Sequence, residues 1–204
     1  MILKGAQRAG AKQLALHLLS EDDNEFVELH EIRGLLSDDV VGAFKEIEAI
    51  AKGTQCKQPF FSVSLSPPPT AGVDVGGFDA AIDRIEAAHG LMGQPRVVIF
   101  HEKEGRRHAH AVWSRIDPET MTAKNLPHFK RKLNQIAHEL FLEHGWEVPA
   151  GFQDGVAASP TNVTLAELSL SRRVGRPLLI GKRRIKDGEQ ASETGRDRQQ
   201  ASAS

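Results

Sequence analysis

Tyrosine is missing from this sequence of 204 residues, and cysteine occurs once, at Cys56. Because no tyrosine is present, no tyrosine side chain can act as a nucleophile. A single cysteine excludes an intramolecular disulfide and any zinc site built on several cysteines, and it is typical of proteins from a reducing compartment. The chemistry of this chain must therefore come from other side chains.

Long apolar runs are missing as well. No stretch approaches the roughly 18 apolar residues that a membrane span requires, and residues 1–10 lack the apolar centre of a signal peptide. We therefore expect a cytoplasmic protein that does not insert into a membrane. Apolar residues make up 40% of the sequence, which supports a hydrophobic core and argues against a globally disordered chain.

The formal net charge of −1 conceals an uneven distribution of charge along the chain. Residues 171–204 contain nine Lys and Arg against four Asp and Glu, whereas residues 1–170 carry a net charge of −6. The basic segment holds few large apolar residues, so it cannot bury enough surface to offset the entropy lost on ordering. We expect a folded domain over residues 1–165 and a basic, disordered tail over residues 166–204. This tail is either a solvated extension or an arm that binds phosphates without sequence preference.

Hydrophobic periodicity predicts interleaved strands and helices. We expect strands over residues 1–4, 26–32, 60–65, 96–101 and 108–116, and helices over residues 11–19, 37–53, 78–88 and 126–141. Residues 102–107 between the last two strands have the length of a hairpin loop, which requires antiparallel pairing there. The sequence thus predicts an α+β fold, with helices packed on a mainly antiparallel sheet in two or three layers.

Three histidines flank the predicted hairpin loop. His108 and His110 share one face of their strand because side chains alternate along a strand, and a six-residue loop places His101 opposite His108. A single histidine on a strand is usually an ordinary polar surface residue. Three histidines that point to the same face of adjoining strands are not explained as ordinary surface residues. Since neutral imidazole is a frequent ligand of divalent metals, His101, His108 and His110 are predicted to bind a metal with open positions for substrate. The opposite face is expected to carry Phe100, Ala109, Ala111 and Trp113.

The segment His108-Ala109-His110, preceded by His101 and followed by residues 111–117, resembles the metal motif of plasmid mobilisation relaxases. These enzymes belong to the histidine-hydrophobe-histidine (HUH) endonucleases, and the similarity covers about residues 1–165. The resemblance implies an antiparallel sheet flanked by helices. It also implies metal-assisted, strand-specific nicking of single-stranded DNA at a transfer origin, after which the enzyme stays covalently attached to the 5′ phosphate.

The nucleophile departs from the usual pattern of these relaxases. Most of them carry tyrosine on the first helix, where this sequence has His17. One branch, similar to the Mob/Pre mobilisation proteins, uses histidine and places an acid three residues after the first histidine of the metal motif, where this chain has Glu104. A neutral imidazole nitrogen can attack phosphorus, forming a phosphoramidate and releasing a 3′ hydroxyl. His17 is therefore the candidate nucleophile. Its helical spacing from Leu14 and Leu18 equally fits simple packing against the sheet, and His30 is the competing candidate.

Further residues are candidates for supporting roles. Glu104 orients a ligand, accepts a proton, or is simply an exposed charge at a turn. Arg106 and Arg107 either clamp phosphates or are solvated turn residues. Ser62 and Ser64 share a strand face with Ser66, where hydroxyl groups can contact a DNA backbone.

A basic run lies near the start of the long predicted helix. Lys130 and Arg131 either bind phosphate or are part of a solvated helix face. The N-terminus of a helix also favours phosphate binding.

The resemblance also implies cofactor and partners. The metal is expected to be a divalent ion, Mg²⁺ or Mn²⁺. The partners are expected to be accessory relaxosome proteins and the coupling protein of a secretion channel, in conjugative mobilisation of a plasmid. Two alternatives stay open: a non-catalytic or truncated relaxase-like protein that binds DNA, and a metal-dependent hydrolase of another substrate.

Overall fold

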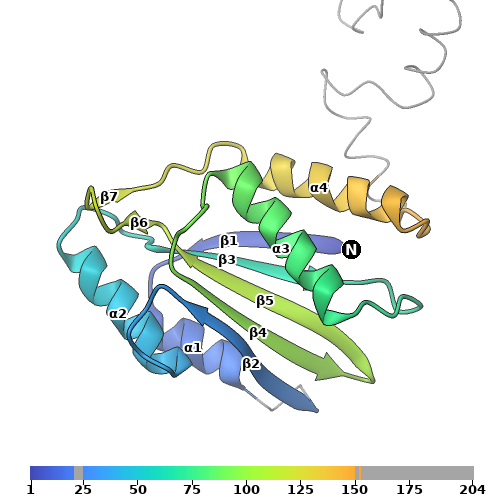
Figure 1. Cartoon of the computed structure of the whole chain (residues 1–204), viewed down its shortest axis with the longest axis horizontal. Helices are drawn as coiled ribbons and strands as arrows, with labels where there is room; N and C mark the ends of the chain where they lie inside the picture. Colours follow the sequence, from blue (N-terminus) through green and yellow to red (C-terminus); the bar gives the residue numbers. More distant parts are fainter. Residues whose placement is uncertain (21–24, 150–151, 153–204) are drawn as a thin grey trace, which may run out of the picture. The chain divides into compact units, whose positions relative to one another are not determined.

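An antiparallel sheet of five strands forms the centre of the protein (Figure 1). The computed structural model describes residues 1–20, 25–149 and 152, and residues 1–148 form one compact unit. The strand order is β1-β3-β5-β4-β2, so β1 and β2 are the two edges. The strands are β1 (Ile2–Arg8), β2 (Phe26–Arg33), β3 (Phe60–Ser66), β4 (Arg96–Lys103) and β5 (Arg106–Ser114). The predicted boundary at residue 165 and the predicted tail 166–204 lie outside the described residues.

Helices cover both faces of this sheet, which makes three layers and confirms the predicted α+β class. The helices are α1 (Ala11–Leu19), α2 (Val40–Lys52), α3 (Val75–His89) and α4 (Phe129–Glu143). On one face, α1 and α2 form a core with the β-sheet residues Phe60, Val97, Ile99 and Val112. On the other face, Phe78 of α3 packs on Phe100 at a ring distance of 5.3 Å, and Phe129 of α4 packs on Phe61 at 5.5 Å.

The helix ends follow local capping chemistry. The Asp39 and Asp74 carboxylates accept hydrogen bonds from backbone N–H groups at the starts of α2 and α3. Gly90 ends α3 in the left-handed region, with φ of 66°, where a side chain is disfavoured. The last helix begins at Phe129, after His128, so Leu126 lies outside it although the side chain of Leu126 is buried. The predicted start of that helix was therefore wrong.

The hairpin between β4 and β5 is tighter than the sequence predicted. The strands extend to Lys103 and from Arg106, so the turn contains two residues, Glu104 and Gly105, both with positive φ. The prediction of a six-residue loop was wrong because its polar residues continue the ladder. The register still pairs His101 with His108, because the loop shortens by the same number of residues on each side. Beyond β5, residues 116 and 117 pair with residues 122 and 123 as the short strands β6 (Ile116–Asp117) and β7 (Thr122–Ala123).

A buried ion cluster fastens α3 to the sheet. The carboxylate of Glu86, 1% exposed, accepts hydrogen bonds from Arg96 (2.6 Å), Arg33 (2.7 Å) and the Trp113 indole (3.2 Å). Because these partners come from β4, β2 and β5, one carboxylate links α3 to three strands.

None of the helices in the described part of the chain is long and apolar enough to cross a membrane.

Candidate metal centre

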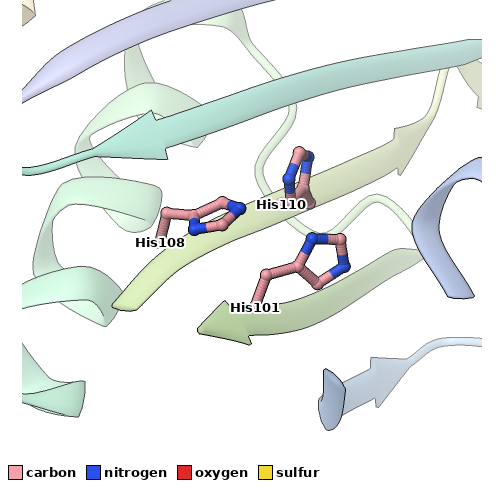
Figure 2. A group of neighbouring side chains, drawn as sticks. All are labelled: His101, His108 and His110. Atoms are coloured by element: carbon pink, nitrogen blue, oxygen red, sulfur yellow. The ribbon is translucent and has the colours of Figure 1, made fainter. Parts of the chain in front are cut away.

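Three histidine rings gather on one face of the β4–β5 hairpin, and Figure 2 shows them turned toward one another. One ring nitrogen from each of His101, His108 and His110 lies within 4.8 Å of the others. The ring centroids are separated by 5.1 Å for His101 and His108, 4.6 Å for His101 and His110, and 5.4 Å for His108 and His110. The structure thus places three potential nitrogen ligands around one point.

The strand register produces this arrangement. His101 is the direct cross-strand partner of His108, and Ile99 is the partner of His110, so all three histidines point to the face that α1 and α2 cover in part. This matches the predicted facing and register. Further along the same strands, this face carries Val97, Ile99 and Val112 in the core, so the rings stand where the hydrophobic contact with α1 and α2 ends.

A hydrogen bond that the His101 ring donates to the backbone of helix α1 fixes the tautomer of His101. Its Nε2 lies 2.7 Å from the backbone carbonyl oxygen of Leu18. A carbonyl only accepts hydrogen bonds, so Nε2 carries the proton and a neutral ring keeps its lone pair on Nδ1. Figure 2 shows this second nitrogen facing the other two rings. Metal-binding histidines commonly show such a hydrogen bond to a backbone carbonyl.

Burial favours the uncharged form of the three rings. It lowers the pKa of His101 and of His108 below the usual value for histidine. For His110, burial and then the charges of His101, His108 and His17 lower the pKa to about 3. Uncharged imidazoles are the form that binds metal ions. Three convergent nitrogens and a fixed tautomer on His101 therefore fit a divalent metal ion.

His17 lies beside this cluster. Its ring centroid is 6.4 Å from that of His110, with the ring planes at 85°. Unlike Leu14 and Leu18, which are buried, His17 is exposed on α1. The alternative in which His17 only packs against the sheet does not fit its exposed side chain. The residue next to it, Leu18, supplies the carbonyl that holds His101, so α1 places both groups at the same site.

His30 lies on the other side of the sheet. Its ring packs on Phe100 at a centroid distance of 4.8 Å, and its Nε2 is 3.1 Å from Asp79 Oδ1 on α3. Phe100 faces α3, whereas the three clustered histidines face α1. The structure therefore brings His17, and not His30, to the candidate metal centre.

Polar side chains extend this site across the sheet. Ser64 is the cross-strand partner of His110, and Ser62 and Ser66 share its face because residues alternate along β3. Lys4 of β1 is in turn the partner of Ser64. The predicted serines thus lie on the same face as the histidines, in a strip that continues to the β1 edge.

The predicted residues of the turn separate onto different faces. Arg106 shares the histidine face at the hairpin end, paired with Lys103, and its charge contributes to lowering the pKa of His108. Arg107 points to the opposite face, 5.4 Å above the Phe100 ring. Glu104 sits at the exposed tip, 3.0 Å from Arg106, and is not among the ligand-type groups that gather at the candidate centre.

The predicted basic residues of α4 lie on the layer opposite the histidines. Arg131 and Lys130 are both exposed in the first turns of this helix. Lys130 lines a cleft at the β1 edge together with Lys4. The helix therefore does not bring these two side chains to the three histidines, although one of them reaches the edge where the polar strip ends.

Sequence reasoning missed Lys4, Lys103 and the carbonyl of Leu18. The alternation of side chains in an extended first strand was the available signal for Lys4, because it sets Lys4 on the face of Ala6 and Arg8. The position of Lys103 follows only once the strand is known to continue past His101. The sequence carries no signal for a backbone carbonyl as the partner of His101.

Comparisons with known proteins agree with this geometry. A comparison with protein-family models matches residues 17–146 to the family described as relaxase, MobA/VirD2-like, nuclease domain. A search of curated proteins gives no match. The family match spans more than half of the chain, beginning at His17 and including the whole histidine cluster. The chain therefore belongs to the MobA/VirD2-like relaxases, a family of DNA-nicking nucleases.

Proposed function

We propose that this relaxase nicks single-stranded DNA at a specific site and on a specific strand of a plasmid transfer origin, by transesterification. In this proposal His101, His108 and His110 hold a divalent metal, Mg²⁺ or Mn²⁺, and His17 is the nucleophile. The observation that carries the proposal is the position of the His17 ring, exposed and 6.4 Å from that of His110.

The chemistry requires a nucleophile and a stabilised phosphate at one point. His101, His108 and His110 would hold the divalent ion, which when bound would polarise the scissile phosphate and stabilise the charge that develops on it. An unprotonated nitrogen of His17 attacks phosphorus, and the bond from phosphorus to the 3′ oxygen breaks. The released oxygen takes up a proton to become a 3′ hydroxyl, while the 5′ phosphate stays on His17 as a phosphoramidate. Attack by a 3′ hydroxyl reverses the step and rejoins the strand.

The surroundings of the histidines support a nucleic-acid substrate despite the acidic net charge of residues 1–170. Lys103 and Arg106 lie on one side of the cluster, and Ser64 with Lys4 on the other. Cations and hydroxyl groups are the usual partners of phosphate oxygens. We infer that the DNA strand crosses this face of the sheet, and that accessory relaxosome proteins and a coupling protein of a secretion channel act with the chain in mobilisation.

A nicking assay tests this proposal. The full chain is incubated with Mn²⁺ and a labelled single-stranded oligonucleotide from its own transfer origin, and the products are separated on a denaturing gel. We expect a protein–DNA adduct that acid destroys, because a phosphoramidate is acid-labile. The adduct is expected to disappear in His17→Ala and on chelation of the metal, and to persist in His30→Ala, the matched control on the opposite face of the sheet.

Other results would favour other functions. Binding of the oligonucleotide without nicking or adduct would indicate a non-catalytic DNA-binding protein. Nicking that leaves no adduct would indicate water as the nucleophile, as in a metal-dependent hydrolase. Loss of the adduct in His30→Ala but not in His17→Ala would refute the assignment of the nucleophile.

A further inference from the structure

A second feature lies at the edge of the sheet, away from the histidines. A cleft of about 250 Å³ opens between the edge strand β1 and the first turns of α4. Its lining consists of Leu3, Lys4, Gly5, Lys130, Leu133 and Asn134. Gly5 allows α4 to lie close to the strand on this side of the sheet, because a Cβ atom on Gly5 would lie 2.5 Å from Leu133 Cδ1.

The chemistry of this lining favours an anion. Lys4 and Lys130 are its charged residues, both are exposed, and none of the six lining residues is acidic. Within the described part of the chain, neither lysine has a salt bridge that would neutralise it. Asn134 adds an amide group, and an edge strand presents backbone N–H groups that no neighbouring strand uses. Lys130 and Asn134 lie on α4, and the Lys4 side chain leaves the edge strand toward the histidine face, so ammonium and amide donors flank both sides of this edge. Such donors are suited to phosphate oxygens.

The position of the cleft indicates the source of the phosphate. Lys4 is paired with Ser64, and Ser64 is paired with His110. Two interstrand spacings of about 4.8 Å therefore separate the backbones of Lys4 and His110. The polar strip of the histidine face ends at Lys4 on the β1 edge, and the cleft lies on the α4 side of the same edge. A chain that continues from the metal centre over this edge is more simply a nucleic-acid strand than an acidic peptide.

We propose that the cleft between Lys4 and Lys130 binds a phosphodiester of the single-stranded DNA, in the stretch that flanks the phosphate at the histidines. This inference rests on the proposed function. The cleft would hold the strand where it passes over the β1 edge, so that α4 contributes to DNA binding although it lies on the other face of the sheet.

Salt-dependent binding of the full chain tests the cleft. The probe is a fluorescein-labelled oligothymidylate, and its anisotropy is followed in EDTA so that no strand is cut. We expect Lys4→Gln and Lys130→Gln each to lower the slope of log affinity against log salt by about 0.7, since each removes one phosphate contact with a single strand. The double variant is expected to bind roughly tenfold or more weakly at about 0.1 M salt.

A matched control and a second readout keep the outcomes separate. Lys45→Gln removes an exposed lysine of α2 and should leave the slope unchanged. The melting temperature and Mn²⁺ affinity of the Lys4 and Lys130 variants should equal those of the wild type. A wild type that binds DNA while the cleft variants behave like Lys45→Gln would overturn the inference about the cleft alone. A wild type that does not bind the probe would also overturn the inference about the cleft, whereas the proposed function is decided separately by the nicking assay with the origin oligonucleotide.

Discussion

The Nε2 atom of His101 lies 2.7 Å from the carbonyl oxygen of Leu18, the residue that follows His17 in the chain. This bond joins the helix that carries the proposed nucleophile to the hairpin that carries the proposed metal ligands. Since the ring of His101 is buried, the hydrogen bond is shielded from competition with water. A shift of α1 along the sheet would therefore move His17 and break the bond to His101 together.

The tautomer of His101 follows from this bond. Burial lowers the pKa of the ring below the usual histidine value, so it should be neutral at pH 7 with the proton on Nε2. Long-range nitrogen–proton NMR spectra of the metal-free protein should show this tautomer, and added Zn²⁺ should shift the Nδ1 resonance most. A proton found on Nδ1 would contradict the predicted ligand atom.

Metal binding should stabilise the fold. A ligand at a hundred times its dissociation constant raises the free energy of unfolding by about 2.7 kcal/mol if it binds the folded state alone. Urea unfolding with and without Mn²⁺ should show this difference in the wild type and a much smaller one in His110→Ala. The control is His144→Ala, which removes a ring stacked on Trp146 outside the cluster. An equal effect of Mn²⁺ on all three proteins would place the metal elsewhere.

Loss of the buried carboxylate of Glu86 should be costly. Glu86→Ala removes the partner that Arg96 and Arg33 share, but Arg96 keeps Glu31 and Asp83. The loss of stability should therefore lie at or below about 3–5 kcal/mol, which is the cost of an uncompensated buried charge. Glu143→Gln breaks an exposed pair with Arg84, so it should cause a far smaller loss. Chemical unfolding of both variants measures the difference, and similar losses would show that the Glu86 cluster does not hold α3 on the sheet.

Acid should destabilise the fold through His89. Burial lowers the pKa of this ring below its ordinary value of 6.5, whereas in the unfolded chain the ring takes up a proton near that pH. The unfolded state then binds more protons, so the free energy of unfolding should fall as the pH drops below about 6.5. His89→Gln removes this contribution. Unfolding measured between pH 7.5 and about 5 should therefore show a weaker pH dependence in the variant, and identical slopes would contradict a depressed pKa.

The candidate metal centre could be predicted from sequence because its geometry depends on alternation alone. His108 and His110 are two residues apart on a strand, so their side chains point to the same face whichever elements the strand packs against. The pairing of His101 with His108 also does not depend on the length of the turn. When the turn shortens, the same number of residues is added to each of the two strands, and the pairs already formed keep their register. Even a wrong loop therefore predicted the right neighbours.

Other parts of the site depend on contacts between distant segments, which local patterns do not encode. The opposite facing of Arg107 and the tip position of Glu104 follow from where β4 ends, and polar residues gave no sign that the strand continues. The positions of His17 and His30 depend on which face each element packs against. Both residues lie in amphipathic segments, and the structure sends them to opposite sides of the sheet.

Strand β3 alternates buried apolar residues with half-exposed serines, and the serines make the sheet less stable than apolar residues would. Phe61, Val63 and Leu65 are fully buried under α3 and α4, while Ser62, Ser64 and Ser66 between them remain half-exposed. Valine or isoleucine at the serine positions would suit a strand better and would add apolar contact. Such replacements are expected to raise the free energy of unfolding, but they would make the strip beside His110 hydrophobic. Engineering for heat resistance should therefore leave these hydroxyl groups untouched and look for its gains elsewhere.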